Sequence, residues 1–483
     1  MLFNSVQYLI FLPIVVALFW LSPRAVKLPM LLVASYVFYA SWNPPFVLLI
    51  IGLTLFNFYW GKFLAKATVH RKNIFTWGIV ANIFTLATFK YANFLLGSVA
   101  AAVHLVTKQS PDYVLNIVLP LGISFFVFEF IHYLFEVNRG GKPVDSFVHF
   151  ALFAAFFPTQ IAGPIKRYDD FMKQMTDKNP FKLEYFDEGL PLIVTGLAKK
   201  ILLADNLAIL VQMGFSNPSA YGAPELWLFT YAFAFQIYFD FSAYTDIARG
   251  SAMLFGYHIP INFNLPYIAS NISDFWHRWH ISLSTWLRDY LFIPMGGSRA
   301  TNWIVNRNIL ITFALGGLWH GASWSFVIWG IFHGLCLVVH REFVALKLRL
   351  PKFEPLWKSG FWRYFSIFLT FNAVCIGDVF FRIQDTKAAF AAVKKMLLFS
   401  PIYTTAEAHQ FFITKETLPI IVPVTVTMVA ILVLINLPLS KLIGDGVFSK
   451  VPPFAKGAFC AALIIAMVIL IPTTSAPFVY FQF

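Results

Sequence analysis

Apolar runs long enough to cross a lipid bilayer recur along almost the whole chain, and they decide what it can fold into. A membrane-spanning helix needs roughly 20 mostly apolar residues. Of the 483 residues, 59% are hydrophobic and only 12% are charged. A soluble protein could not shield so much apolar surface from water. The sequence therefore predicts an all-α, polytopic membrane protein.

Assignment of these runs gives about a dozen membrane spans. We predict spans near residues 5–21, 28–42, 45–61, 74–96, 113–137, 189–213, 226–256, 309–319, 322–340, 362–381, 419–437 and 455–472. Lys and Arg prefer cytoplasmic loops. We therefore place on the cytoplasmic side the basic loops 24–27, 62–72, 139–142, 166–182 and 341–352. The first run lacks the preceding charge and following cleavage site of a signal peptide. We expect it to be an uncleaved span with its N-terminus outside.

Two segments do not fit as simple spans. Residues 146–165 separate two basic loops and end in Gly163-Pro164, which breaks a helix, so we expect a re-entrant hairpin surrounded by protein. Residues 257–308 hold three prolines and four arginines, and we expect short oblique helices at the cytoplasmic interface. The long polar segment 384–418 is left for the outer face. We find no linker, and predict one transmembrane domain, 1–483, with a catalytic core at about 113–345.

The charge balance and the cysteines exclude several functions. A net charge of +13 marks cytoplasmic loops here, because no basic run is interleaved with aromatics as in a nucleic-acid-binding domain. The three cysteines lie in apolar runs without Cys-x-x-Cys spacing. This argues against a disulfide framework and a cysteine-based zinc site.

A histidine interrupts the apolar sequence LGGLWHGASWSFVIWG, residues 315–330. His320 lies between Gly317 and Gly321, next to Trp319. It is either a packing residue bonded to a neighbouring helix or a general base, which burial would keep uncharged. The chain has no Gly-rich phosphate loop, no G-x-S-x-G and no H-E-x-x-H. A base without a protein nucleophile favours direct attack of a substrate hydroxyl on an activated acyl group. His333, thirteen residues on, is predicted to pack.

Titratable and aromatic residues gather in SDFWHRWHISLSTWLRDYLF, residues 273–292. The spacing puts His277 and His280 on one helical face, but the other histidines are scattered and we predict no metal site. Arginine binds phosphate groups through two hydrogen bonds. The tryptophans are either interfacial anchors or walls for a flat ligand such as adenine. The predicted anion- and donor-binding set is Arg278, Arg288, Trp279, Trp286 and Asp289.

Polar residues also form stripes on the predicted span 226–256. Gln236, Asp240 and Tyr244 recur every four residues, and Asp246 and Arg249 are spaced to pair. We interpret Asp240, Tyr244, Asp246 and the neighbouring Trp319 as a scaffold beside the reactive site. Lys199 and Lys200 break the apolar run 189–213, and the sequence alone does not separate snorkelling from a polar entry.

The chain resembles one family in six segments taken together. They are FWHRWHISLSTWLRDYLFIPMGG, LGGLWHGASWSFVIWG, QIYFDFSAYTDIARG, Ala162-Gly163-Pro164-Ile165, Phe380-Phe381-Arg382 and the final FVYFQF. It is the membrane-bound O-acyltransferase superfamily, and in particular its bacterial polysaccharide O-acetyltransferase branch. The resemblance covers essentially the whole chain. It implies a ring of about 11–12 tilted spans with re-entrant and interfacial helices around a central tunnel.

The resemblance also implies a reaction and its residues. The family's catalytic histidine falls on His320 and its second position on His280. The implied donor is acetyl-CoA from the cytoplasm, with no permanently bound cofactor. The acetyl group would pass toward an extracytoplasmic polysaccharide through a partner acetyltransferase of the SGNH type. A location in the bacterial cytoplasmic (inner) membrane follows. We expect Arg278, Arg288 and the tryptophans to form the donor-side mouth of the tunnel, because CoA carries several negative charges.

Three alternatives remain open from sequence. A teichoic acid D-alanyltransferase and a peptidoglycan O-acetyltransferase share the fold, and these motifs do not separate them. A transporter or flippase would use the polar stripes as a substrate path. The paired broken helices in two halves that are typical of transporters are missing, which favours the enzyme.

Overall fold

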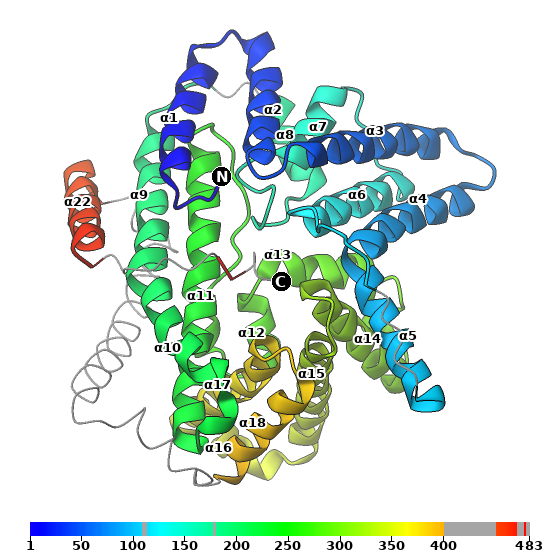
Figure 1. Ribbon diagram of the computed structural model, residues 1–483, viewed down its shortest axis with the longest axis vertical. Helices are drawn as coiled ribbons and strands as arrows, with labels where there is room; N and C mark the ends of the chain where they lie inside the picture. Colours follow the sequence, from blue (N-terminus) through cyan, green and yellow to red (C-terminus); the bar gives the residue numbers. More distant parts are fainter. Residues whose placement is uncertain (109–113, 177–179, 400–450, 471–477, 480–483) are drawn as a thin grey trace. The chain divides into compact units, whose positions relative to one another are not determined.

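The computed structural model describes residues 1–108, 114–176, 180–399, 451–470 and 478–479, and this part is built from helices (Figure 1). It divides into two compact units. Unit 1 comprises 1–193 and 244–260, and unit 2 comprises 194–243 and 261–483. The division falls inside two helices, α9 (Glu184–Ala198) and α11 (Ala223–Met253).

Unit 1 consists mainly of the N-terminal helices. They are α1 (Val6–Leu21), α2 (Arg24–Ala40), α3 (Pro45–Lys66), α4 (Arg71–Leu86), η1 (Ala87–Tyr91), α5 (Ala92–Thr107), α6 (Ile123–Asn138), α7 (Phe147–Ala155) and α8 (Tyr168–Thr176). Helix α1 begins where the Ser5 side chain accepts a hydrogen bond from the Tyr8 amide, and it ends before Pro23. The predicted span 113–137 is helical only from Ile123, because Pro120 and Gly122 precede the helix.

The segment predicted to be re-entrant contains a helix too short to cross a bilayer. Helix α7 has nine residues and begins at Ser146, whose side chain accepts from the His149 amide. The chain then turns at 157–163. Gly163 is required there, because a Cβ atom would lie 2.4 Å from the Thr159 Cα atom. The helix itself ends at Ala155, eight residues before the break that was predicted at Gly163-Pro164.

Unit 2 holds the sequence motifs. Its elements are η2 (Lys199–Ala204), α10 (Asp205–Ser216), η3 (Pro218–Ala220), η4 (Pro266–Ile268), α12 (Ile272–Arg278), α13 (Ile281–Leu287), η5 (Arg288–Phe292), η6 (Gly297–Arg299), α14 (Asn302–His320), α15 (Trp324–Arg349), η7 (Pro351–Phe353), α16 (Glu354–Trp357), α17 (Gly360–Arg382), α18 (Thr386–Leu398) and α22 (Pro453–Leu470). Short helices are present between 266 and 299, as expected over 257–308. The predicted span 419–437 lies outside the described residues.

Helices α14 and α15 pack closely against each other (Figure 1). Two glycines permit this approach. A Cβ atom on Gly317 would lie 2.1 Å from the Phe326 carbonyl oxygen, and one on Gly330 would lie 2.1 Å from the Phe313 carbonyl oxygen. The backbones therefore touch where α14 ends at His320, and this contact fixes the position of the histidine relative to α15.

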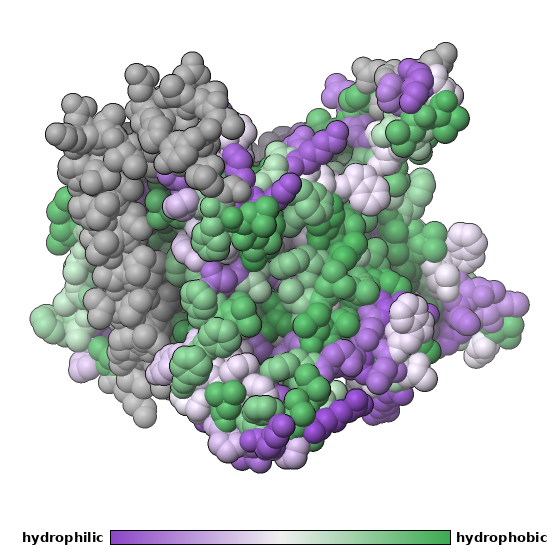
Figure 2. Space-filling model, turned by 90° about the horizontal axis from the view of Figure 1, so that it is seen from below, coloured by the Kyte–Doolittle hydropathy of each residue, from purple (hydrophilic) through white to green (hydrophobic). Residues whose placement is uncertain are grey.

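Five of the described helices are long and apolar enough to cross a membrane. They are Pro45–Lys66, the continuous run Arg71–Thr107, Trp324–Arg349, Gly360–Arg382 and Pro453–Leu470. Many large hydrophobic side chains on these helices are exposed, and Figure 2 shows broad hydrophobic areas on the face it presents. Such surface is compatible with lipid rather than water. The other predicted spans within the described residues fall on helices that are shorter or, like the 31-residue α11, less apolar.

Candidate active site

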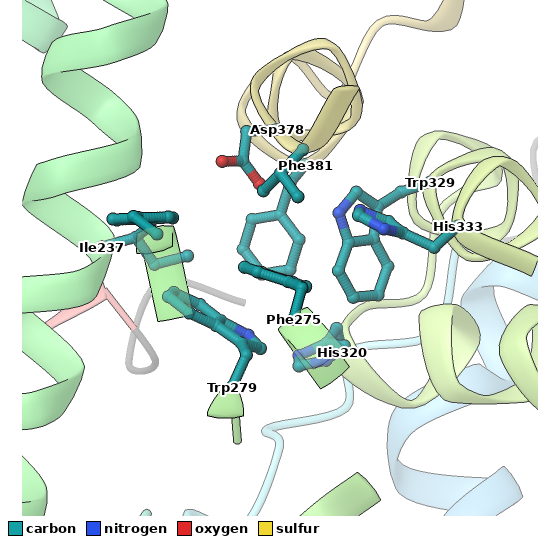
Figure 3. A pocket seen from close by; sticks show the side chains of 10 residues that line it. Ile237, Phe275, Trp279, His320, Trp329, His333, Asp378 and Phe381 are labelled. Carbon is teal, nitrogen blue, oxygen red and sulfur yellow. The ribbon is translucent and has the colours of Figure 1, made fainter. Parts of the chain in front are cut away.

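His320 lies in the wall of a small cavity inside unit 2 (Figure 3). The lining atoms come from α11, η4, α12, α14, α15 and α17, and from Trp279 directly after α12. The wall is mostly apolar and aromatic. Its lining residues are Ile237, Tyr267, Phe275, Trp279, His320, Trp329, His333, Val374, Asp378 and Phe381. An apolar pocket with a few converging polar groups is the usual form of a small-molecule site.

Aromatic rings hold His320 in this wall. The imidazole is 7% exposed and lies edge-on to Trp319, Trp329 and Phe381, with ring centroids 4.9, 5.1 and 5.3 Å away. It is the last residue of α14, so its side chain is carried by a helix end whose position is fixed by the glycine contacts described above. These contacts pack the ring against the cavity wall.

His280 lies close to His320 but outside the cavity wall. The centroids of the two imidazoles are 6.2 Å apart, too far for a direct hydrogen bond between ring nitrogens. His280 is fully buried against Phe241 and Trp319. Burial lowers the pKa of His280 to about 3, so this imidazole is uncharged at neutral pH. The structure thus brings together the two histidines that the sequence analysis singled out.

The backbone at His280 differs from the sequence-based expectation. Helix α12 ends at Arg278, and His280 has a left-handed φ of 43° before α13 begins. The prediction that His277 and His280 share one helical face is therefore wrong, because the helix breaks between them. His277 is exposed, and its Nδ1 atom lies 2.7 Å from the Ser273 carbonyl oxygen. Among the described residues, no cluster of three metal-ligating side chains occurs.

A buried asparagine holds the start of α13 in place. The Asn262 carbonyl accepts from the Ile281 amide at 3.0 Å, and its side-chain oxygen accepts from the Ser282 amide at 3.1 Å and hydroxyl at 2.6 Å. A left-handed non-glycine residue is disfavoured and persists only where neighbouring contacts determine it. These bonds fix the backbone that orients His280.

The predicted donor-binding residues divide into buried rings and charged side chains that are half-buried or exposed. The guanidinium of Arg278 donates to Asp274 at 2.7 Å, and that of Arg288 donates to Asp289 at 2.7 Å. The Arg288 side chain is 54% exposed. The rings are less accessible: Trp279 is buried and lines the cavity, and Trp286 is buried against Tyr290.

The polar residues of α11 have separate partners. In unit 1, Tyr244 stacks on Phe3, and Arg249 lies 3.8 Å from Asp246, as its spacing predicted. In unit 2, the buried Asp240 forms an ion pair of 2.7 Å with Lys200, which lies 2.8 Å from Asp205 as well. Lys200 is buried, so it neither snorkels nor lines an open entry in this structure.

Sequence reasoning missed part of the cavity wall. Asp378, Tyr267 and Trp329 were not singled out, and His333 was predicted to pack. A carboxyl group within a predicted span was the available signal for Asp378, since intramembrane acids are rare and costly. His333 was judged by helical spacing from His320, but the chain reverses at 321–323 and brings it back to the same cavity.

Comparison with known proteins gives consistent results. Residues 64–377 match the family described as MBOAT, membrane-bound O-acyltransferase family. The chain is 41% identical over 408 residues to the probable alginate O-acetylase AlgI of Azotobacter vinelandii, covering 83% of this chain and 78% of that protein. It is 33% identical to the peptidoglycan O-acetyltransferase of Helicobacter pylori, covering 85% and 83%. It is 30% identical to the teichoic acid D-alanyltransferase of Bacillus subtilis, covering 69% and 85%.

Proposed function

Because the chain belongs to the membrane-bound O-acyltransferase family and is a multi-pass membrane acyltransferase, we propose that it moves acetyl groups from cytoplasmic acetyl-CoA toward hydroxyls of an extracytoplasmic polysaccharide. The higher identity to alginate O-acetylases than to the D-alanyltransferase supports acetyl over D-alanyl transfer. In this proposal the protein resides in the bacterial inner membrane and works with an SGNH-type acetyltransferase on the outer side.

The observation that carries the proposal is the position of His320 in the cavity wall. In this role, its imidazole takes the proton of the attacking hydroxyl and later gives it to the leaving thiolate. General-base catalysis of this kind is worth about 10²- to 10⁴-fold in rate. His280, whose ring centroid lies 6.2 Å from that of His320, would support the base from outside the cavity wall. The aromatic wall excludes bulk water, which protects the thioester from hydrolysis.

The proposal is tested with the purified protein in detergent or proteoliposomes and radiolabelled acetyl-CoA. We expect label to move to a polysaccharide or oligosaccharide acceptor, with or without a purified SGNH-type acetyltransferase. Labelled D-alanine on its carrier, offered in parallel, should not be transferred. Transfer of D-alanine but not acetyl would reverse the assignment of the acyl group. Movement of intact polysaccharide across the vesicle membrane without covalent change would identify a transporter.

Arg288 provides a test of donor binding. Its exposed guanidinium pairs with Asp289 through Nε and keeps further N–H groups that a phosphate group can accept from. We expect Arg288→Ala to raise the KM for acetyl-CoA by roughly tenfold, the loss of about one charge-assisted hydrogen bond, with kcat little changed. Steady-state kinetics at low salt measure this. Arg299→Ala, at another exposed arginine, is the matched control. An unchanged KM would mean that Arg288 only anchors the interface.

A further inference from the structure

One carboxyl group of the cavity wall has no partner in the protein around it. Asp378 lies on α17, and its side chain is buried yet points into the cavity (Figure 3). Within the part of the chain that the structure describes, no cation and no hydrogen-bond donor contacts this carboxyl. The nearby hydroxyl of Tyr267 donates instead to the Ala234 carbonyl, at 2.5 Å.

This arrangement costs folding free energy. Burying a polar group without a hydrogen bond costs roughly 1–3 kcal/mol, and an unpaired charge costs far more. A carboxyl group without a neighbouring cation in an apolar wall is therefore more stable as the uncharged acid. In that form it has one O–H group to donate. A leucine of similar size would stabilise the fold more, so stability alone does not explain a carboxyl group at this position.

The surroundings of Asp378 support a role in binding substrate. Figure 3 shows Asp378 and His320 on different sides of the cavity, with Phe381 between them in this view and Trp329 to one side. Trp329 Nε1 and both ring nitrogens of His333 are likewise buried without a hydrogen-bond partner in the described residues. Several polar groups without partners therefore face one small space that also contains the proposed base.

An acyl transfer needs a hydrogen-bond donor opposite its base. When the acceptor oxygen attacks, negative charge develops on the carbonyl oxygen of the acyl group, and a fixed donor stabilises that charge. His320 is committed to the proton of the acceptor. Asp378 is the side chain in the wall that offers an O–H group from another direction.

We propose that Asp378, as an uncharged acid, donates a hydrogen bond to the carbonyl oxygen of the acyl group while His320 removes the proton of the acceptor hydroxyl; this rests on the proposed function. The acceptor oxygen forms a bond to the carbonyl carbon as the π electron pair moves onto the carbonyl oxygen. The carbonyl then re-forms, the carbon–sulfur bond breaks, and the thiolate takes the proton held by His320. Asp378 keeps its own proton throughout.

Two substitutions of nearly equal size separate this role from others. Asp378→Asn keeps a donor, through its amide, and removes the acid. Asp378→Leu removes the donor and fills the same volume. We expect Asp378→Leu to lower kcat by about 10²- to 10³-fold, the usual effect of losing one such donor. We expect Asp378→Asn to stay within about tenfold of the wild-type kcat. The KM for acetyl-CoA should change little in either variant.

The midpoint of thermal unfolding in detergent distinguishes a role of Asp378 in the reaction from a role in stability. Because Asp378→Leu removes a buried group without a partner, its midpoint of unfolding should equal or exceed that of the wild type. Loss of activity together with unchanged or higher stability supports the proposal. Full activity of Asp378→Leu would overturn it, and so would equal losses in both variants, which would indicate a required negative charge.

His320→Ala, assayed beside these variants, distinguishes a failure of the Asp378 proposal from a failure of the proposed function. If His320→Ala is inactive and Asp378→Leu is fully active, only the role of Asp378 fails. If His320→Ala transfers acetyl groups at the wild-type rate, the proposed function of the cavity fails as a whole.

Discussion

Replacement of His320 by alanine is expected to reduce acetyl transfer by about 10²- to 10⁴-fold, the contribution of a positioned general base. The loss should appear in kcat, because the imidazole acts on the proton during the reaction and the substrates are held by other groups. The protein should still fold and insert, because the ring contacts of Trp319, Trp329 and Phe381 with their other neighbours remain. The measurement is the rate of label transfer from acetyl-CoA by purified protein with matched unfolding temperatures.

His340 supplies the matched control for this prediction. It is a partly buried histidine on the adjacent helix α15 and lies outside the cavity wall. His340→Ala should therefore keep near-wild-type transfer. Equal activity in the two variants would show that His320 is a packing residue, which is the alternative left open by its sequence.

The fold was predictable because its main signal is local. Apolar runs define spans, and proline and glycine define their breaks, as at Pro120 and Gly122 before α6. The boundaries were less predictable, since α6 begins only at Ile123 and α14 already at Asn302. Such ends depend on capping and on packing against helices far away in the sequence.

The candidate site was predictable where its residues belong to dense motifs. His320 and His280 meet in the structure, 40 residues apart in the chain. Asp378 was missed because it is a single acid in an otherwise apolar helix, and only the tertiary fold brings it to the same cavity. The partner of Asp240 was missed for the same reason: Lys200 belongs to another helical segment, and no helical spacing relates the two.

The buried lysine of that ion pair carries the second large prediction. Lys200 is 1% exposed and lies 2.7 Å from Asp240 and 2.8 Å from Asp205, both buried. Asp240 accepts a further hydrogen bond from the Val479 amide at 2.6 Å, and Lys200 lies over the ring of Phe478. One ammonium group therefore contacts two carboxyl groups and connects three distant parts of unit 2. The C-terminal residues 478 and 479 depend on this cluster for their position.

Lys200→Met is expected to destabilise the protein by about 3–5 kcal/mol, because removing one partner leaves uncompensated buried charge. Unfolding in detergent, followed by circular dichroism or by cysteine accessibility, measures the loss. Lys199→Met, at the neighbouring and only partly buried lysine, is the control and should cost much less. The triple variant Lys200→Met, Asp205→Leu, Asp240→Leu should regain most of the stability, because an apolar set of similar volume has no charge to compensate. If the triple variant were as unstable as Lys200→Met, the loss would come from packing around η2, and the electrostatic account of this cluster would be wrong.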